Sequence, residues 1–286
     1  MKRYYIQIKD NSVTVLDALI QNLSLTCLQA QKLIHQGSVW QVKPEKRIKD
    51  GTRVVTNELL RVNLPFYQVV ECHITADDVA YDDKWLFVVY KKANVPVHPT
   101  PYSDIDSLSW AVGEYCADSL GGYVPSAINR LDKPTQGLVF FAKDKETERR
   151  LHAMFREHAM KKRYIATTHP VDALQSSYCI RDAVEWNDKT KTALTYVRFI
   201  GEYNRLFYYL VFPQTGRTHQ IRQHFLKRIA PLFGDKKYGH GTSHDEMGLI
   251  CFEYKFTHPR TGNVVRIRKL PEDITIIHQR CQETNT

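Results

Sequence analysis

Asp132 is the first residue in this sequence whose setting suggests chemistry. It lies two residues after Arg130 in a polar loop, and apolar stretches at residues 123–128 and 138–142 flank that loop. Carboxylates are rarely buried without a partner, so a loop between two buried strands must give Asp132 a cation or a chemical role. The sequence therefore marks Asp132 as a candidate reactive carboxylate.

A second candidate, Arg222, lies in a predicted helix that Thr218 is expected to cap. The apolar stripe of this helix contains Arg222 among Ile221, Phe225, Leu226 and Ile229. Such an arginine either extends its charged end to solvent or points inward to a fixed anion. In the second case Arg222 pairs with Asp132 and keeps the carboxylate ionised and oriented, and loss of one member of a buried pair costs about 3–5 kcal/mol.

The composition is that of a folded and basic protein. The chain has 286 residues, of which 43% are hydrophobic, and 40 Lys and Arg against 31 Asp and Glu give a net charge of +9. This length suits one large domain, or a large domain with a small one. The basic excess favours a polyanionic partner such as nucleic acid, although a basic protein without such a partner has the same composition.

The cysteines and the N-terminus bear on the compartment. The six cysteines are scattered without a C-x-x-C pair, so we expect reduced thiols rather than a zinc site or a disulfide framework. Reduced thiols are typical of a cytoplasmic protein. The N-terminus lacks the apolar core of a signal sequence, and no stretch approaches the roughly 20 apolar residues of a membrane span.

Residues 1–70 are predicted to form a small α/β domain. Apolar residues in the range 13–36 recur at helical spacing in two parts, with Thr26 as the cap of the second helix and Gly37 at its end. Short strands and a turn are expected to follow, at residues 39–42, 49–52 and 54–55.

Residues 71–286 are predicted to form the larger domain. Asp144 is expected to cap a helix whose inner stripe contains Leu151, Met154, Phe155 and His158. Another helix and four strands are predicted at residues 107–116, 85–90, 162–167, 206–212 and 250–256. Because helices and strands alternate irregularly, we expect an α+β fold with a mixed, largely antiparallel sheet flanked by helices and loops.

Several blocks of the sequence resemble the RluA-type pseudouridine synthases, which convert uridine to pseudouridine in structured RNA. Residues 128–138 resemble the catalytic loop of that family, 161–164 its Lys-x-Tyr element and 216–222 its Gly-Arg-x-His-Gln-Ile/Leu-Arg motif. Further blocks that resemble the family lie at residues 234–239, 256–262 and 269–271. The resemblance is specific because the blocks occur in the order of the family between about residues 80 and 272.

The resemblance implies a role for individual residues. It implies Asp132 as the catalytic carboxylate, Arg222 as the arginine that bridges it, and Tyr164 as the side chain that stacks on the target base and helps to shift the C5 proton. It also implies substrate contacts, for which the candidates are Arg130, Arg217, His219, Gln220 and Lys269. No metal or cofactor is expected, because breaking the N1–C1′ bond and forming a C–C bond at C5 needs no redox centre.

The resemblance also bears on the substrate. Residues 1–70 resemble the RNA-binding module that is named after a ribosomal small-subunit protein, and a small packing domain is the other interpretation. We therefore expect an RNA partner, with ribosomal RNA preferred to transfer RNA, and a monomer without a membrane. Asn129 and Gln136 replace the usual His and Ser or Thr of the loop, which bears on substrate preference more than on chemistry.

Three other functions are weighed against this one. A phosphatase with a carboxylate nucleophile needs a second Asp two residues after Asp132, where the chain has Pro134. A metal-dependent hydrolase needs convergent ligands, but His219 and His224 diverge by about 140° on a helix. A non-catalytic RNA-binding protein with the same fold is the third alternative, and the presence of Asp132, Tyr164 and Arg222 argues against it.

Overall fold

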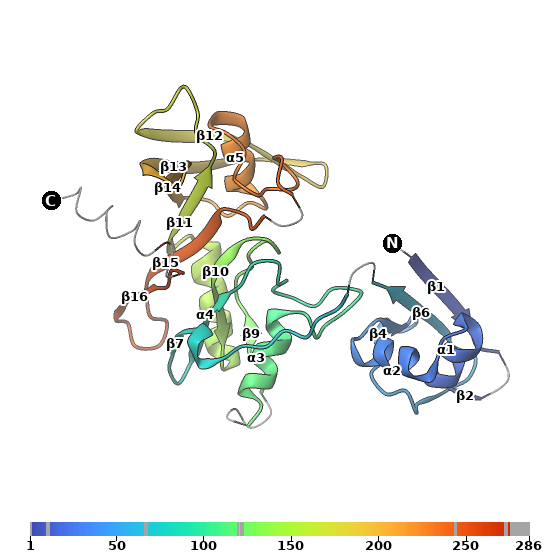
Figure 1. Cartoon of the computed structure of the whole chain (residues 1–286). Helices are drawn as coiled ribbons and strands as arrows, with labels where there is room; N and C mark the ends of the chain where they lie inside the picture. The colour runs from blue at the N-terminus through green and yellow to red at the C-terminus, as the bar shows by residue number, and fades with distance from the viewer. Residues whose placement is uncertain are drawn as a thin grey trace. The chain divides into compact units, whose positions relative to one another are not determined.

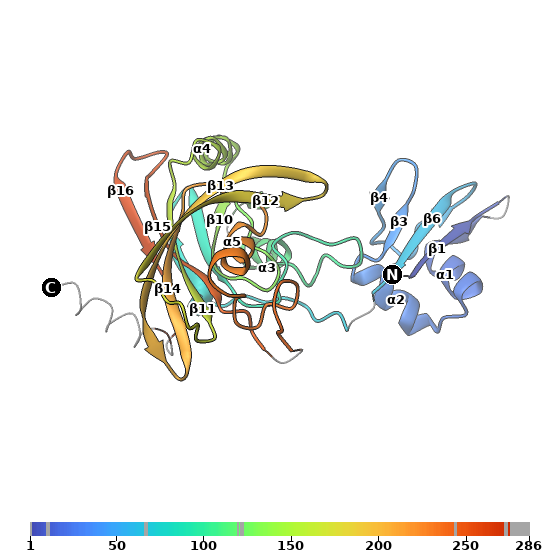
Figure 2. The same cartoon turned by 90° about the horizontal axis from the view of Figure 1, so that it is seen from above.

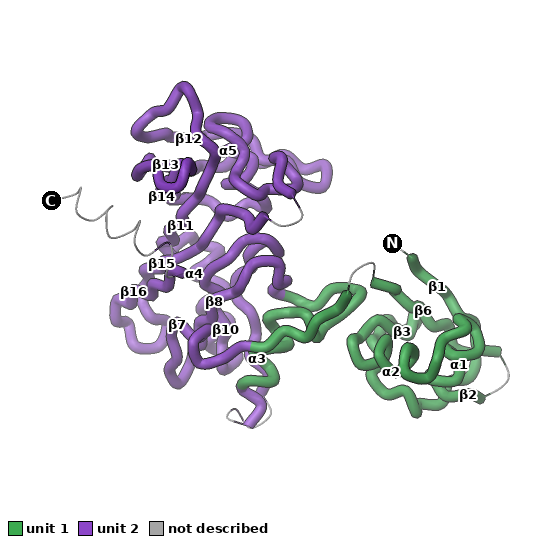
Figure 3. The backbone as a smooth tube through the Cα atoms, viewed as in Figure 1, with its two compact units in different colours: residues 1–73, 98–115 green, residues 74–97, 116–286 purple. Residues whose placement is uncertain are grey.

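The structure is a computed structural model of the whole chain, and it describes residues 2–9, 12–65, 68–118, 120, 123–242, 245–271 and 274. Two compact units make up the chain, one with residues 1–73 and 98–115 and the other with residues 74–97 and 116–286 (Figure 3). Among the described helices, none is long and apolar enough to cross a membrane.

The first unit is a small antiparallel sheet with two helices (Figure 1). The order of the strands is β1-β6-β3-β4. The elements are β1 (Lys2–Gln7), β2 (Val13–Thr14), α1 (Val15–Leu23), α2 (Cys27–His35), β3 (Val39–Gln41), β4 (Lys46–Arg47), β5 (Val54–Val55) and β6 (Leu59–Leu64). As predicted, Thr26 caps α2, in a capping box with Gln29, and Gly37 ends the helix at φ +82°.

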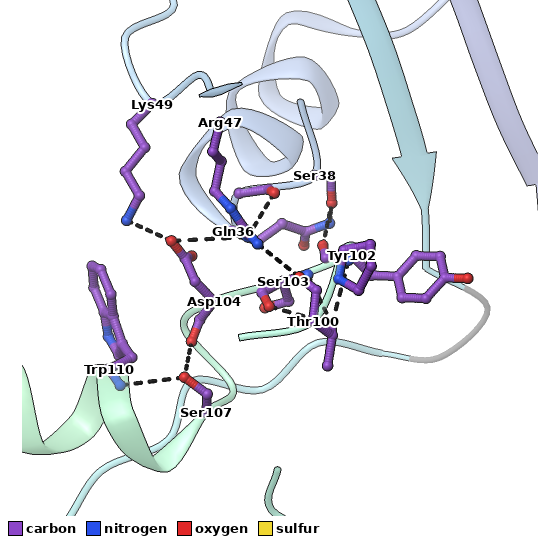
Figure 4. A network of polar contacts seen from close by, with 12 residues as sticks. Gln36, Ser38, Arg47, Lys49, Thr100, Tyr102, Ser103, Asp104, Ser107 and Trp110 are labelled. Atoms are coloured by element: carbon purple, nitrogen blue, oxygen red, sulfur yellow. Dashed lines mark hydrogen bonds and ion pairs between the residues drawn. The ribbon is translucent and has the colours of Figure 1, made fainter. Parts of the chain in front are cut away.

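The segment 98–115 belongs to the first unit, which the predicted division at residue 70 did not include. Its backbone is hydrogen-bonded to the residue that ends α2, because the Asp104 N–H donates to the Gln36 carbonyl at 3.0 Å. The Asp104 carboxylate lies 2.6 Å from the Lys49 ammonium (Figure 4). α3 (Leu108–Cys116) continues this segment. Such pairings join residues more than 50 positions apart, and local patterns cannot reveal them.

The second unit is built on a ten-stranded sheet (Figure 2). Its main path has the order β12-β13-β14-β11-β15-β10-β8-β7, with β16 beside β15 and β9 beside β10. The strands are β7 (Val79–Asp82), β8 (Leu86–Lys91), β9 (Ser126–Ala127), β10 (Gln136–Ala142), β11 (Lys161–Thr168), β12 (Ser177–Trp186), β13 (Lys189–Tyr203), β14 (Leu206–Pro213), β15 (Leu249–Thr257) and β16 (Val264–Arg268), and the 3₁₀ turn η1 (Ala76–Asp78) precedes them.

The predicted α+β class with a mixed, largely antiparallel sheet is confirmed. Among the described strand pairs, only β10 and β15 run parallel. Gly137 makes their close approach possible: its φ is +124°, and a Cβ at this position would lie 2.1 Å from the Cys251 carbonyl oxygen. This glycine therefore fixes the end of the loop that carries Asp132 against β15.

Two helices flank this sheet. α4 (Lys145–Arg156) packs against β10, and Asp144 caps it as predicted, by accepting the Thr147 N–H at 2.8 Å. Leu151 of the predicted inner stripe is buried. His158, in contrast, is exposed and lies beyond the end of the helix, at φ +57°. The stripe was extended by one turn too many, because the chain leaves the helix after Arg156.

α5 (Gln220–Arg228) lies beside the β12–β13 hairpin (Figure 2). The Gln223 amide joins the two by bonding both the N–H and the carbonyl of Glu185, at 3.0 and 2.8 Å. The prediction that Thr218 caps this helix was wrong, because the chain turns at His219, whose φ is +57°, and the helix starts at Gln220. Leu226 was wrongly placed in the inner stripe, since it is 42% exposed.

Candidate active site

The loop that carries Asp132 is held by a tight turn and by a buried lysine. The Thr135 N–H donates to the Asp132 carbonyl at 3.0 Å, which closes the turn. Lys91 is fully buried, and its ammonium donates to the carbonyls of Lys133, Val95 and Lys92 at 2.8 to 3.0 Å. Three carbonyl oxygens compensate the burial of this charge and fix the loop behind the carboxylate.

Asn129 anchors the other end of the loop. Its side-chain oxygen accepts the Phe140 N–H at 2.8 Å, and its amide nitrogen donates to the Leu138 carbonyl at 3.3 Å and to the Tyr254 hydroxyl at 3.2 Å. The amide thus ties the chain before Asp132 to β10. These contacts explain how an asparagine can serve at the position where the resembling family usually has a histidine.

Arg222 meets two carboxylates. Its side chain is buried in α5, and one guanidinium nitrogen lies 3.2 Å from Asp132 Oδ2, which is the pairing predicted from the helix stripe. The stronger partner is Asp235, which accepts two parallel hydrogen bonds of 2.7 Å from Nε and Nη2. Arg222 is therefore fixed by Asp235 and presents its remaining face to Asp132.

Asp235 is the residue that the sequence analysis did not identify. Its carboxylate also accepts the backbone N–H groups of Lys237 and Tyr238, at 2.9 and 3.0 Å. Burial alone would raise the pKa of Asp235, but these hydrogen bonds and the Arg222 guanidinium outweigh it and hold the pKa below its ordinary value. An ionised Asp235 keeps the buried Arg222 charged and oriented.

His219 forms the second contact of Asp132. Its Nε2 lies 3.5 Å from Asp132 Oδ2, and its Nδ1 lies 2.9 Å from the Tyr238 hydroxyl. Burial lowers the pKa of His219, and the neighbouring Arg222 and Lys237 charges act in the same direction against the opposing effect of Asp132. The imidazole is thus neutral at pH 7, and if Tyr238 donates to Nδ1, the Nε2–H points at Asp132.

Tyr164 lies on β11 and is buried. Burial raises the pKa of its phenol well above the ordinary value, and the nearby Cys251 and Asp132 raise it further. Burial likewise raises the pKa of the Cys251 thiol to about 11. Both groups are therefore protonated at neutral pH, so that Tyr164 offers an aromatic face and a neutral hydroxyl rather than a phenolate.

A cavity of about 150 Å³, here named the Asp132 cavity, connects these groups. Its walls come from the Asp132 loop, β11 and the segment that leads into α5. They include five predicted site residues besides the Asp132 carboxylate and Gln220, namely Arg130, Tyr164, Arg217, His219 and Arg222. In the described part of the chain, no hydrogen bond reaches Asp132 Oδ1, so this oxygen is available to a bound molecule.

The other predicted substrate contacts differ from one another. Arg130 and Arg217 are exposed at the cavity, and neither has a carboxylate partner among the described residues. Gln220 lines the cavity but is buried, and its amide makes four hydrogen bonds within the protein, to the side chains or backbone of Leu194, Thr195, Thr215 and Arg217. Its amide thus shapes the segment before α5.

Lys269 does not line the Asp132 cavity. Its ammonium donates to the Asp77 carbonyl instead. Besides Asp235, the sequence analysis assigned no role to Tyr238, and it placed Lys162 only within the basic Lys-x-Tyr element at residues 161–164. Asp235 and Tyr238 lie in the block at residues 234–239, which resembles the family. The Asp235 carboxylate in that block was the available signal, because an inward-facing Arg222 needs an anion.

Comparisons with known proteins identify the family of this chain. A family model described as RNA pseudouridylate synthase matches residues 85–227, which span half of the chain. This match covers the Asp132 loop, β11 and α5 up to Lys227. The chain belongs to the RNA pseudouridylate synthase family, whose members are isomerases, and the predicted RluA-type membership is confirmed.

Curated relatives from several bacteria support this membership. An uncharacterized RNA pseudouridine synthase of Aquifex aeolicus is 30% identical over 269 residues, which cover 81% of each chain. The ribosomal large subunit pseudouridine synthase D of Zymomonas mobilis is 29% identical over 233 residues, covering 73% of this chain and 74% of its own. The ribosomal large subunit pseudouridine synthase C of Buchnera aphidicola is 26% identical over 261 residues, covering 80% and 81%.

Among solved structures, the chain has the fold of the human RNA pseudouridylate synthase domain containing 4 protein. The TM-score is 0.57 at 19% identity, and the match covers 72% of this chain and 93% of the human one. The human RNA pseudouridylate synthase domain containing 1 protein gives a TM-score of 0.56 at 20% identity, covering 71% and 86%.

Proposed function

We propose that this protein isomerises uridine to pseudouridine in RNA and that Asp132 is the catalytic carboxylate. The observation that carries the proposal is the asymmetric setting of this side chain. Oδ2 faces the Arg222 guanidinium at 3.2 Å and the His219 imidazole at 3.5 Å, whereas Oδ1 accepts no hydrogen bond from the described residues, and Asp132 lines the Asp132 cavity. A carboxylate with one oxygen oriented by two protein partners and the other left for a ligand is suited to act on a bound nucleotide.

Tyr164 is the proposed surface on which the target uracil stacks. A base must leave its helical stack to reach a cavity of this kind, and an aromatic face compensates part of the few kcal/mol that unstacking costs. Because its phenol stays protonated, Tyr164 can hydrogen-bond the base as it turns, but it is a poor proton acceptor in its resting state. This favours stacking and orientation over proton abstraction.

Arg222 and Asp235 are the proposed support of the reacting group. The two parallel hydrogen bonds between them fix the guanidinium, so that Asp132 is held without a further change in geometry during the reaction. Arg130 and Arg217 are proposed to contact the RNA, because they are exposed at the cavity. Lys269 lies outside the cavity, so any contact that it makes would be with a more distant part of the RNA.

Large-subunit ribosomal RNA is the proposed substrate. Two relatives of similar length, from Zymomonas mobilis and Buchnera aphidicola, are named as ribosomal large subunit pseudouridine synthases. The basic excess of the chain, 40 Lys and Arg against 31 Asp and Glu, suits a structured RNA. We propose the cytoplasm as the compartment, because that is where such an RNA is assembled in bacteria.

The proposal is tested by release of tritium from C5-labelled uridine in ribosomal RNA, taken from cells that lack this protein. The purified protein should release label from this RNA without added metal or cofactor, and also in the presence of a chelator. Asp132→Asn should reduce the rate by about a thousandfold or more, as expected for loss of a reacting group. Asp172→Asn, which changes an exposed carboxylate, is the matched control.

The outcomes separate the alternatives. Wild-type protein that binds RNA tightly but releases no label from any RNA fraction would contradict the proposed activity and favour the non-catalytic alternative. Undiminished release by Asp132→Asn would contradict the assignment of the carboxylate. Release from transfer RNA, but not from ribosomal RNA, would retain the enzyme and correct its substrate.

A further inference from the structure

Lys162 is a half-buried cation without a counter-ion. It lies on β11, two residues before Tyr164, and lines the Asp132 cavity. Among the described residues no carboxylate or hydrogen-bond acceptor pairs with its ammonium. Burial lowers the pKa of Lys162, and the Cys251 thiol, the one nearby group that would raise it, is protonated at neutral pH. Burying an ammonium without an anion is costly, so a bound anion would stabilise it.

The surroundings leave this ammonium open to a ligand. Gly216 lies beside it: a Cβ built on that glycine would be 3.3 Å from the Lys162 Nζ. No side chain therefore covers Lys162 from this direction. Lys162 and Tyr164 are two residues apart on β11, a spacing of about 7 Å along a strand, and both line the Asp132 cavity. A nucleotide whose base stacks on Tyr164 can thus place a phosphate near Lys162.

Lys162 also lines a second cavity, of about 300 Å³, here named the neighbouring cavity. The two cavities share Lys162 and Pro213. Apolar walls come from Phe155, Met160 and Phe212, and the Gln214 amide lies at the rim. A concave site with aromatic walls and one amide suits a nucleobase, which needs a flat apolar contact and a hydrogen-bonding edge.

The charges around the neighbouring cavity favour a polyanion. Its one acidic residue is Glu253, whose buried carboxylate is already engaged by Arg163, Arg266 and Arg268 at 2.8 to 3.8 Å. The remaining charged side chains of the cavity are lysines, namely Lys161, Lys162 and Lys255. This imbalance attracts phosphate groups to the rim.

We propose that the two cavities form a dinucleotide site: the target uridine occupies the Asp132 cavity, the neighbouring base occupies the neighbouring cavity, and Lys162 binds the phosphate that joins them. This inference rests on the proposed function and names a part of the RNA that the site recognises. It makes Lys162 a substrate-binding residue and the neighbouring cavity a determinant of the sequence next to the modified uridine.

The role of Lys162 is tested by the kinetics of tritium release from ribosomal RNA. Lys162→Met keeps the length of the side chain and removes its charge. KM should rise roughly tenfold or more, as for loss of a hydrogen bond to a charged group, while kcat at saturation changes little. The slope of log KM against log salt concentration should fall by about 0.7 to 0.9, the value of one phosphate contact. Lys162→Arg should restore most of the loss.

Lys191→Met is the matched control, because Lys191 is an exposed lysine on β13 that lines neither cavity. It should leave KM unchanged. Wild-type KM and salt slope for Lys162→Met would overturn the proposal while leaving the enzyme function intact. A fall in kcat at unchanged KM and salt slope would overturn it as well, since Lys162 would then act in the chemistry.

Binding of small nucleotides tests the neighbouring cavity without any turnover. Uridine 5′-monophosphate, uridine 3′-monophosphate and the dinucleotide UpU are compared by ligand-observed NMR with the full chain carrying Asp132→Asn. UpU should bind at least several-fold more tightly than the better monophosphate, and that monophosphate identifies the side on which the neighbour lies. Gln214→Trp, which fills the neighbouring cavity at an exposed position, should remove the gain for UpU alone.

Two results would overturn the dinucleotide site in this second experiment. One is UpU that binds no more tightly than either monophosphate. The other is a gain for UpU that persists when Gln214→Trp fills the neighbouring cavity. Neither result depends on turnover, so an inactive wild-type protein would refute the proposed function and still leave this inference testable by the same binding measurements.

Discussion

The two compact units differ in how their arginines and lysines are used. In the first unit Arg47, Arg53 and Arg61 each pair with a carboxylate, and Lys49 lies 2.6 Å from Asp104. Around the Asp132 cavity of the second unit, Arg130, Lys162 and Arg217 have no carboxylate partner among the described residues. Cations that are already paired add little to the binding of a polyanion, so Arg130, Lys162 and Arg217 are better placed to contact RNA than Arg47, Arg53 and Arg61.

The largest expected effect is on the buried ion pair of the second unit. Arg222→Leu removes two hydrogen bonds to Asp235 and leaves its buried carboxylate without its cation. The free energy of unfolding should therefore fall by about 3–5 kcal/mol. Urea denaturation measures this change. The double variant Arg222→Leu with Asp235→Leu removes both charges and should recover part of the stability. A single variant as stable as wild type would contradict the account of this pair.

The next largest effect is on RNA binding, where an arginine without a carboxylate partner is compared with a paired one. Arg130→Met should raise KM for ribosomal RNA roughly tenfold and lower the salt slope by about 0.7 to 0.9, because one phosphate contact is lost. Arg53→Met, whose partner Glu58 lies 2.9 Å away in the first unit, should change neither value appreciably. Equal effects of the two variants would refute the comparison and give the first unit a direct part in RNA binding.

A smaller effect concerns the segment 98–115. Asp104→Asn keeps the shape of the side chain but removes the partner of Lys49, at a cost of about 1 kcal/mol for a pair with one exposed member. Exchange of the Cys72 amide hydrogen, which bonds the Ile105 carbonyl, should become faster, while amides between β11 and β14 keep their rates. Unchanged exchange at Cys72 would show that the carboxylate does not hold this segment.

The smallest expected effect is the dependence of stability on mildly acidic pH. Burial lowers the pKa values of His219 and His224 below the ordinary value of 6.5. The unfolded chain then binds protons more tightly than the folded one, so stability is complete above pH 6.5 and declines as the pH falls below it. Urea midpoints at pH 7.5 and 5.5 measure this loss.

Replacing both histidines tests whether they cause this pH dependence of stability. His219→Gln combined with His224→Gln should flatten the dependence between these two pH values. Asp235 has a lowered pKa and contributes in the opposite way: its stabilisation is complete above its ordinary value of 3.8 and is lost as the pH falls through its folded value. The histidine window therefore lies well above that of Asp235. A dependence that stays as steep in the double variant would contradict the histidine assignment.

Local signals predicted much of this structure from the sequence. The Thr26 and Asp144 caps depend on residues within three positions, and the structure confirms both. The Asp132–Arg222 pair joins residues 90 positions apart, and a buried charge in a helix stripe still predicted it, because such a charge requires an anion.

The features that the sequence did not reveal have a common physical origin. Asp235 was not predicted because several carboxylates could pair with an inward-facing arginine. Only the turn that follows α5 in the folded chain brings Asp235 to Arg222. Thr218 was expected as a cap, but His219 takes a left-handed conformation that periodicity cannot show. The inclusion of the segment 98–115 in the first unit depends on contacts such as Arg47 with the Thr100 carbonyl, which no local pattern contains.

The most direct test of the central claim is a map of pseudouridines in cells whose only copy of the gene carries Asp132→Asn. Parallel cells carry Asp172→Asn, and the level of the protein is matched in both. We predict that at least one pseudouridine of large-subunit ribosomal RNA disappears in the Asp132→Asn cells and persists in the Asp172→Asn cells. A complete set of pseudouridines in both would contradict the assignment of catalysis to the Asp132 cavity.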